Sequence, residues 1–256
     1  MRYKIIIEYD GTNYSGWQRQ KDNFSIQESI EKAIQLFSGE TVVVYGCGRT
    51  DAGVHALGQV AHFDLTKEYE PSKVVLAINF YLKYNTCAKS DKNAVTQDIT
   101  ILDCEIVDEN FHARFSAKKR YYKYRILNRQ QPSAIDYKMW HIGKKLDFEK
   151  MQEALPLFIG KKDWTSFRDT ECQAKSPIKT IDKVSLTKNG DEIIFEIEAK
   201  SFLHHMVRNI VGTLVDVGLN KITVEELNEI IEAKDRTKAG PTASPQGLFF
   251  VLVQYI

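Results

Sequence analysis

One short stretch of the chain gathers residue types that could do chemistry together. Residues 46–56 read GCGRTDAGVHA, so a cation, a carboxylate and an imidazole stand among three glycines. Glycine opens backbone shapes closed to other residues and lets a ligand approach the main chain. We call residues 46–56 the aspartate loop. Its Arg49 and Asp51 stand two positions apart, His55 follows them, and such a set could hold a reactive group. A turn whose Arg–Asp pair only fixes its shape would show the same pattern, and the loop alone does not decide between the two interpretations.

Motifs for cofactors and metals are missing from the sequence. The aspartate loop lacks the third glycine and the following helix of a dinucleotide fingerprint, and no Gly-Lys-Ser/Thr of a P-loop occurs. Neighbouring residues on a helix point about 100° apart, so we do not expect His204 and His205 to hold a metal. The cysteines have no CxxC spacing and fit a reducing cytoplasm. They are Cys47, Cys87, Cys104 and Cys172.

Composition sets wide limits on the class of protein. The 256 residues, 43% hydrophobic and 27% charged, suit a globular protein with one large or two small domains. We find neither a signal peptide pattern nor an apolar run of membrane-spanning length, and therefore expect a cytoplasmic protein without membrane contact. The net charge of +1 indicates no nucleic-acid partner by itself. However, residues 114–129 hold seven basic residues and no acid, which suits either a phosphate backbone or a solvated strand.

The elements that must position the aspartate loop follow from hydrophobic periodicity and turn signals. Ser25 and Glu28 form a capping box that starts a helix, and Gly39 ends it. The order in the first half is β-α-β-β-α-β, as in a split ferredoxin-like unit. Its predicted elements are strand 2–9, the helix before Gly39, strands 42–45 and 59–65, a helix from residue 71, and strand 99–107.

The second half repeats this order with one extra helix. Its predicted elements are strand 120–127, helix 148–158, strands 178–187 and 192–200 joined at Asn189-Gly190, helices 202–214 and 224–233, and strand 248–256. We therefore predict an α+β fold of two ferredoxin-like halves, residues 1–110 and 111–256. Pseudo-twofold symmetry would relate the halves, with mainly antiparallel sheet and a cleft between them, where sites usually form.

Two further segments combine aromatic and basic side chains. In residues 16–20, GWQRQ, Trp17 and Arg19 could contact nucleic acid, although the residues alone favour a core position for Trp17. In strand 120–127, alternation places Arg120 and Tyr122 on one face. If that face is buried, Arg120 needs a partner; a half-buried edge strand with solvated lysines is the other interpretation.

Several of these segments resemble one known family. Residues 48–56, GRTDAGVHA, resemble the signature loop of the TruA family of tRNA pseudouridine synthases, a highly specific match. Residues 16–20, 111–117 (FHARFSA) and 202–212 (FLHHMVRNIVG) are also similar to family segments, so the resemblance extends over essentially the whole chain. The closing loop departs from the family pattern at residues 244–246.

The resemblance implies roles for individual residues. Asp51 matches the essential catalytic aspartate, and Arg208 matches the arginine that pairs with it. Asp51 could add to the base, attack the sugar or abstract a sugar proton. Tyr122 matches the active-site tyrosine; because a tyrosine is mostly protonated at neutral pH, stacking on the base is a firmer role for it than accepting the C5 proton. Arg49 would act as a wedge or phosphate clamp when the uridine flips out.

The remaining implications concern substrate and partners. The family isomerises uridines 38–40 in the anticodon arm of tRNA, and it works as a homodimer in which one tRNA touches both subunits. Isomerisation adds and removes no group, so no cofactor is expected. Trp17, Arg19, His55 and Arg120 complete the expected substrate-binding set.

Two other classes of protein fit parts of the pattern. A non-catalytic RNA-binding protein could use doubled ferredoxin-like units as RRMs do, but phosphate binding has no use for the carboxylate of Asp51. An RNA uracil C5-methyltransferase would need a nucleophilic cysteine, for which Cys47 is the candidate, and a methyl-donor site. Methylation adds mass to the RNA and isomerisation does not, so one mass measurement separates them.

Overall fold

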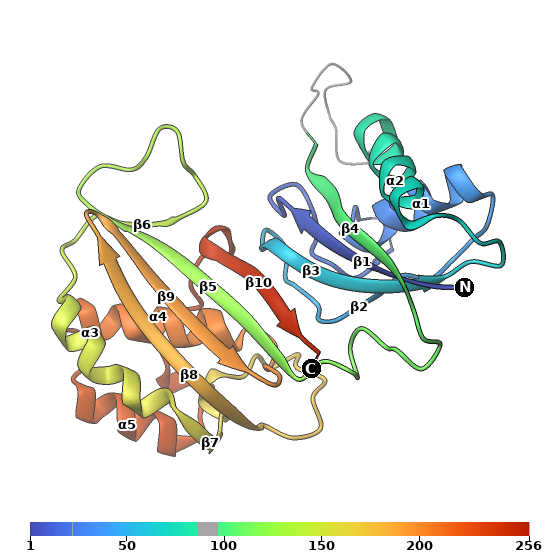
Figure 1. Ribbon diagram of the computed structural model, residues 1–256. Coiled ribbons are helices and arrows are strands. Elements are labelled where there is room, and N and C mark those ends of the chain that lie inside the picture. Colours follow the sequence, from blue (N-terminus) through green and yellow to red (C-terminus); the bar gives the residue numbers. More distant parts are fainter. Residues whose placement is uncertain (22, 86–96, 256) are drawn as a thin grey trace. The chain divides into compact units, whose positions relative to one another are not determined.

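The computed structural model describes residues 1–21, 23–85 and 97–255, and the chain forms two compact units (Figure 1). The first unit comprises residues 1–118 and 249–256, and the second comprises residues 119–248. The units thus differ from the predicted domains, because the closing strand pairs with a strand of the first unit, Phe249 opposite His55. Cys87 lies outside the described residues.

The first unit has the predicted order of elements, followed at the chain's end by β10. Its strands form the order β4-β1-β3; β2 is antiparallel to β3, and β10 is parallel to β3. The two helices pack side by side, and α2 also contacts β4 (Figure 1). The elements are β1 (Arg2–Tyr9), α1 (Ile26–Ser38), β2 (Tyr45–Gly46), β3 (His55–Asp64), α2 (Pro71–Asn85), β4 (Ile99–Val107) and β10 (Leu248–Gln254).

Local signals account for the boundaries of α1. The Ser25 hydroxyl accepts a hydrogen bond from the Glu28 amide at 3.2 Å, as the capping box predicts. Gly39 ends the helix with a left-handed φ of 77°, a shape that glycine adopts without steric cost. Ile26, Ile30 and other apolar residues at helical spacing are fully buried, which fixes this helix to the sheet.

Two strands of the first unit differ from the prediction. The predicted strand 42–45 is reduced to Tyr45–Gly46, because the Val44 amide donates to the carboxylate of Glu31 instead of joining a strand ladder. Strand β3 begins at His55 rather than at residue 59, since Ala56 pairs with Tyr9 of β1. The last two residues of the aspartate loop are therefore strand residues.

The second unit contains a four-stranded antiparallel sheet in the order β5-β9-β8-β7, with β6 parallel to β5. Helices α3, α4 and α5 contact one another (Figure 1). The strands are β5 (Lys119–Asn128), β6 (Trp140–Ile142), β7 (Gly160–Asp163), β8 (Ile178–Asn189) and β9 (Glu192–Ala199). The helices are α3 (Phe148–Ala154), α4 (Met206–Gly218) and α5 (Val224–Ala233), with 3-10 turns η1 (Leu155–Phe158), η2 (Thr165–Phe167), η3 (Arg236–Lys238) and η4 (Pro245–Gly247).

The hairpin and the fold class are confirmed, while some boundaries differ. Asn189 pairs with Glu192 across the predicted turn, where Gly190 has a φ of 58°. Strands β6 and β7 were not predicted, and α4 begins at Met206 because His205 has a left-handed φ of 58°. The α+β class with mainly antiparallel sheet is confirmed; the pseudo-twofold relation and the cleft stay predictions. Within the described residues, every helix is too short or too polar to cross a bilayer.

Candidate functional site

The aspartate loop is anchored to the chain segment that follows β1. The hydroxyls of Tyr9 and Thr50 lie 2.7 Å apart, and burial raises the pKa of Tyr9, which keeps its hydroxyl neutral as a hydrogen-bonding group. The Trp17 amide donates to the Thr50 carbonyl at 3.0 Å. Thr50 precedes Asp51 directly, so these bonds fix the backbone from which the carboxylate projects.

Two glycines permit this close packing of backbone on backbone. A Cβ at Gly11 would lie 2.0 Å from the Val54 carbonyl oxygen, and one at Gly16 would lie 2.5 Å from the Thr50 carbonyl oxygen. Gly16 also has a φ of +89°, which other residues rarely adopt. Sequence reasoning missed Gly11 and Gly16 as parts of the site, although two glycines after the first strand are a visible signal of close approach.

The other side of the aspartate loop rests on Gln59 of β3. Its side-chain amide donates to the Gly48 carbonyl at 2.9 Å, and its carbonyl oxygen accepts from the Cys47 thiol at 2.8 Å. Gln59 is fully buried, so these bonds are shielded from water. This role could not be predicted, because a glutamine inside an apolar strand carries no chemical pattern of its own.

Arg49 and Asp51 occupy different positions on the anchored loop. Arg49 is exposed, whereas Asp51 is half-buried. The Val54 amide donates to the Asp51 carbonyl at 3.2 Å, which closes a turn around Ala52 and Gly53. The loop therefore holds one carboxylate in a defined place and leaves a cation two positions away accessible to a large ligand.

His55 and Trp17 lie in the core beneath the loop. His55 is buried, its Nδ1 lies 3.0 Å from an Asp10 carboxylate oxygen, and its ring stacks on Phe249 with centroids 4.8 Å apart. The Gly11 amide also donates to Nδ1, at 3.2 Å. His55 thus supports the loop from the core, and its contact with RNA stays a prediction.

Trp17 packs in the core, which was one of the two interpretations of its segment. It is 2% exposed, and its ring occupies the space in front of Gly46, where an added Cβ would lie 2.5 Å from it. Burial of this large apolar ring is favourable, and it leaves no face on which a base could stack. Arg19 is exposed and lies 3.7 Å from Glu28 and 3.5 Å from Glu31, both on α1.

The alternation predicted for strand β5 holds in the second unit. Arg120, Tyr122 and Tyr124 share the buried face of β5. The Tyr122 ring packs edge to face on Phe202 with centroids 5.2 Å apart. Arg120 donates to the Lys200 carbonyl, which is a partner of the kind that a buried guanidinium requires.

Acidic residues on neighbouring segments neutralise much of the basic stretch 114–129. Arg125 pairs with Glu192 of β9 and with Asp136. Lys119 lies 3.4 Å from Glu198 and 3.5 Å from Asp182. The expectation of a strongly basic strand for phosphate binding is therefore weakened, because the sequence could not show which acids stand opposite it.

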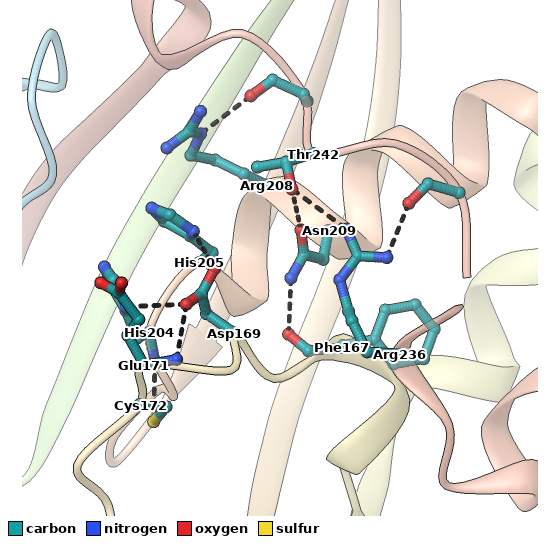
Figure 2. Close-up of polar contacts among 12 residues, drawn as sticks. Phe167, Asp169, Glu171, Cys172, His204, His205, Arg208, Asn209, Arg236 and Thr242 are labelled. Carbon is teal, nitrogen blue, oxygen red and sulfur yellow. Dashed lines mark hydrogen bonds and ion pairs between the residues drawn. The ribbon is translucent and has the colours of Figure 1, made fainter. Parts of the chain in front are cut away.

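Arg208 lies on the first turn of α4, which a buried polar network holds in place (Figure 2). The Arg208 Nε donates to the Ala243 carbonyl at 2.8 Å. Asn209, fully buried, donates to the Phe167 carbonyl at 2.9 Å and accepts from Thr242 at 2.7 Å and from Arg236 at 3.1 Å. This network joins α4 to two loops and so fixes the origin of the Arg208 side chain.

A carboxylate fixes the residue in front of α4. The Nδ1 of His205 lies 2.7 Å from Asp169, and the Glu171 amide donates to the same carboxylate at 2.9 Å (Figure 2). Although burial opposes it, these two hydrogen bonds lower the pKa of Asp169. His205 is held in its left-handed conformation, and the helix begins directly after it. His204 lies farther from Asp169, at 3.6 Å.

The predicted site residues are divided between the two units, and each set is anchored within its own unit. The first unit holds Trp17, Arg19, Arg49, Asp51 and His55, and the second holds Arg120, Tyr122 and Arg208. A carboxylate such as that of Asp51 can act as a base or a nucleophile, whereas the guanidinium of Arg208 stays charged and can only stabilise negative charge.

Comparison with known proteins gives concordant results. A family model described as tRNA pseudouridine synthase matches residues 5–116 and 154–256. Two curated relatives, both named tRNA pseudouridine synthase A, come from Wolbachia pipientis wMel and from Ehrlichia canis (strain Jake). Each is 50% identical over 257 residues, and the similarity covers 100% of this chain and 100% of each relative.

Proposed function

We propose that this chain, which belongs to the tRNA pseudouridine synthase family and is an RNA uridine isomerase, acts on uridines 38–40 of the tRNA anticodon arm. The observation that carries the proposal is the aspartate loop, whose family-like sequence stands on a rigidly anchored backbone. The full-length similarity to proteins named tRNA pseudouridine synthase A supports the choice of tRNA.

Asp51 is the proposed essential carboxylate. The reaction breaks the glycosidic bond between N1 and the ribose, turns the uracil, and joins C5 to the ribose; the C5 proton leaves and N1 gains one. A group that acts on the ribose or the ring must stand still while the base turns, since small misplacement is costly in rate. The bonds from Tyr9, Trp17 and Gln59 to the loop support this role of Asp51.

Tyr122 and Arg208 are the proposed companions of Asp51. Tyr122 packs on the uracil of the flipped nucleotide, a role that suits an aromatic ring held by Phe202 and by its place on β5. Arg208 pairs with Asp51 through their opposite charges. The fixed helix start and the bond to Ala243 support a positioned guanidinium.

Arg49 assists the flipping step. Its exposed side chain shares the loop with Asp51, so it fills the space that the uridine leaves, or binds the neighbouring phosphate. Arg19 and Arg120 are proposed to belong to the tRNA-binding surface, where each either contacts the tRNA or holds the residues that do. We further infer that the enzyme acts in the cytoplasm as a homodimer, with one tRNA touching both subunits.

The test measures tritium released from tRNA labelled at uracil C5, together with the mass of the RNA. The proposal predicts release with unchanged mass. Transcripts with cytidine at positions 38, 39 and 40 together should release none, whereas a transcript changed at uridines elsewhere should release as much as the parent. Release that persists in the triple-cytidine transcript would contradict the assignment of the anticodon arm, and a gain of mass would indicate a methyltransferase.

A further inference from the structure

A continuous row of aromatic rings reaches the surface of the first unit. The ring centroids of Phe115 and His112 are 4.4 Å apart, those of His112 and His62 are 4.6 Å apart, and those of His62 and Tyr45 are 5.1 Å apart. The two ends of this aromatic row are exposed, Phe115 to 76% and Tyr45 to 48%. Such spacing leaves ring faces available to further flat groups.

Backbone hydrogen bonds preform the aromatic row. The Nδ1 of His112 accepts from the amides of Arg114 at 3.1 Å and Phe115 at 3.4 Å, and the Ser116 hydroxyl accepts from the His112 amide at 3.0 Å. These bonds fold the link after β4, green in Figure 1, into a tight turn. The exposed Phe115 ring is therefore held by its neighbours rather than left on a loose loop.

His62, the buried ring inside the row, is fixed in the same way. The Ala113 amide donates to the Nδ1 of His62 at 3.2 Å, and the Tyr255 hydroxyl donates to the Ala113 carbonyl at 2.9 Å. The Tyr45 ring stacks on His62 with an interplanar angle of 21°. Because both imidazoles accept hydrogen bonds at Nδ1, each has its neutral form in this structure.

Burial is the main reason that the two imidazoles are uncharged, and Arg2 beside them is itself paired with Asp64. Burial, the neighbouring His112 and Arg2 lower the pKa of His62 to about 4. Burial, Arg2 and Arg114 lower the pKa of His112. Arg114 is itself exposed, and its guanidinium lies 5.8 Å from the Phe115 ring centroid. Uncharged ring faces beside an exposed cation suit a ligand with flat bases and phosphates.

We propose that the aromatic row of Tyr45, His62, His112 and Phe115, with Arg114 beside it, is an RNA-binding surface that stacks unpaired bases of the tRNA substrate. The identity of the RNA rests on the proposed function. Stacking would use the exposed faces of Phe115 and Tyr45, and Arg114 would neutralise a neighbouring phosphate. The surface is distinct in role from Asp51, since none of its groups needs to act on the reacting uridine.

A protein interface fits this surface less well than RNA does. The core of a subunit interface is a contiguous apolar patch, depleted of charged residues other than arginine. Here the two exposed rings do not form one contiguous patch, because two histidines whose Nδ1 atoms accept from backbone amides lie between them. Single-stranded RNA needs these features, because bases stack on separate rings while phosphates lie between them.

The test compares binding of fluorescein-labelled hexauridylate by anisotropy. Phe115→Leu removes the exposed ring, Arg114→Gln removes the charge, and Phe80→Leu is the control, because Phe80 is an exposed aromatic of the same unit on α2. We expect Phe115→Leu to weaken binding about tenfold and Arg114→Gln about threefold, with no change in Phe80→Leu. Equal affinities of wild type and Phe115→Leu, or no binding by the wild type, would overturn the proposal.

Two further readouts separate the remaining outcomes. Sedimentation of the same proteins should show one oligomeric state; dissociation caused by Phe115→Leu alone would assign the surface to a subunit interface and overturn the RNA assignment. Tritium release from tRNA should show a raised KM and an unchanged kcat in Phe115→Leu. If the wild type releases no tritium but binds hexauridylate through Phe115, the proposed function fails and the RNA-binding surface stands.

Discussion

Gly16→Ala tests whether the backbone contact under the aspartate loop positions Asp51. The added Cβ would lie 2.5 Å from the Thr50 carbonyl oxygen and 3.0 Å from the Asp51 carbonyl carbon. An ordinary contact begins at 3.4 Å, so the Thr50 carbonyl must retreat by about 0.9 Å. A shift of this size at a catalytic group costs roughly 100-fold in rate, and we expect kcat to fall by that factor.

Gly39→Ala is the matched control for backbone strain. Gly39 also has a positive φ, of 77°, but nothing lies within 4 Å of its added Cβ. A left-handed conformation costs a non-glycine residue roughly 1–2 kcal/mol, so urea titration should show that loss in both variants and a larger loss in Gly16→Ala. The kcat of Gly39→Ala should equal that of the wild type.

The comparison can refute the reasoning directly. Rates are measured as tritium release under saturating tRNA, so that binding losses do not enter kcat, and at a temperature at which both variants are folded. If Gly16→Ala is folded at the assay temperature and keeps the kcat of Gly39→Ala, the contact between Gly16 and Thr50 does not position Asp51. A fall of kcat in both variants would also contradict the argument, since Gly39 touches no part of the loop.

Two other variants test the anchors of α4 and of the aromatic row. Asp169→Asn removes the charge-assisted bond to His205 and should lower kcat about tenfold without changing the Kd for tRNA, measured by filter binding; an unchanged kcat would show that the bond does not position Arg208. Burial lowers the pKa of His62 to about 4 from 6.5, so stability from its neutral ring is full above pH 6.5 and is lost as pH falls towards 4. Over that pH range, urea titrations should show that the free energy of unfolding falls by ~3 kcal/mol less in His62→Gln than in the wild type. Equal losses in the two proteins would contradict the lowered pKa of His62.

The sequence predicted the parts of the molecule that local patterns determine. Period-two alternation placed Tyr122 and Arg120 on the buried face of β5, and the capping box placed the start of α1. The Asn-Gly turn fixed the β8–β9 hairpin. Each of these features depends on residues close together in the chain, so the sequence contains the whole signal.

Features that depend on distant partners were missed or wrong. The predicted strand 42–45 shortened because Glu31, far away in the chain, takes the Val44 amide. The residues alone favoured a core position for Trp17, and its ring fills the space that Gly46 leaves, whereas the contact with RNA that the family resemblance implied stays a prediction. His55 turned into the core because Asp10 lies opposite it. Tertiary contacts decide such positions, and a single sequence does not reveal them.

The most direct test of the site is the single-turnover rate of Asp51→Asn on tRNA labelled with tritium at uracil C5. The substitution keeps the shape of the side chain and removes its charge. We predict that Asp51→Asn binds tRNA with the affinity of the wild type and releases no tritium. Tritium release at the wild-type rate, with tRNA bound normally, would contradict the role of Asp51 as the essential carboxylate.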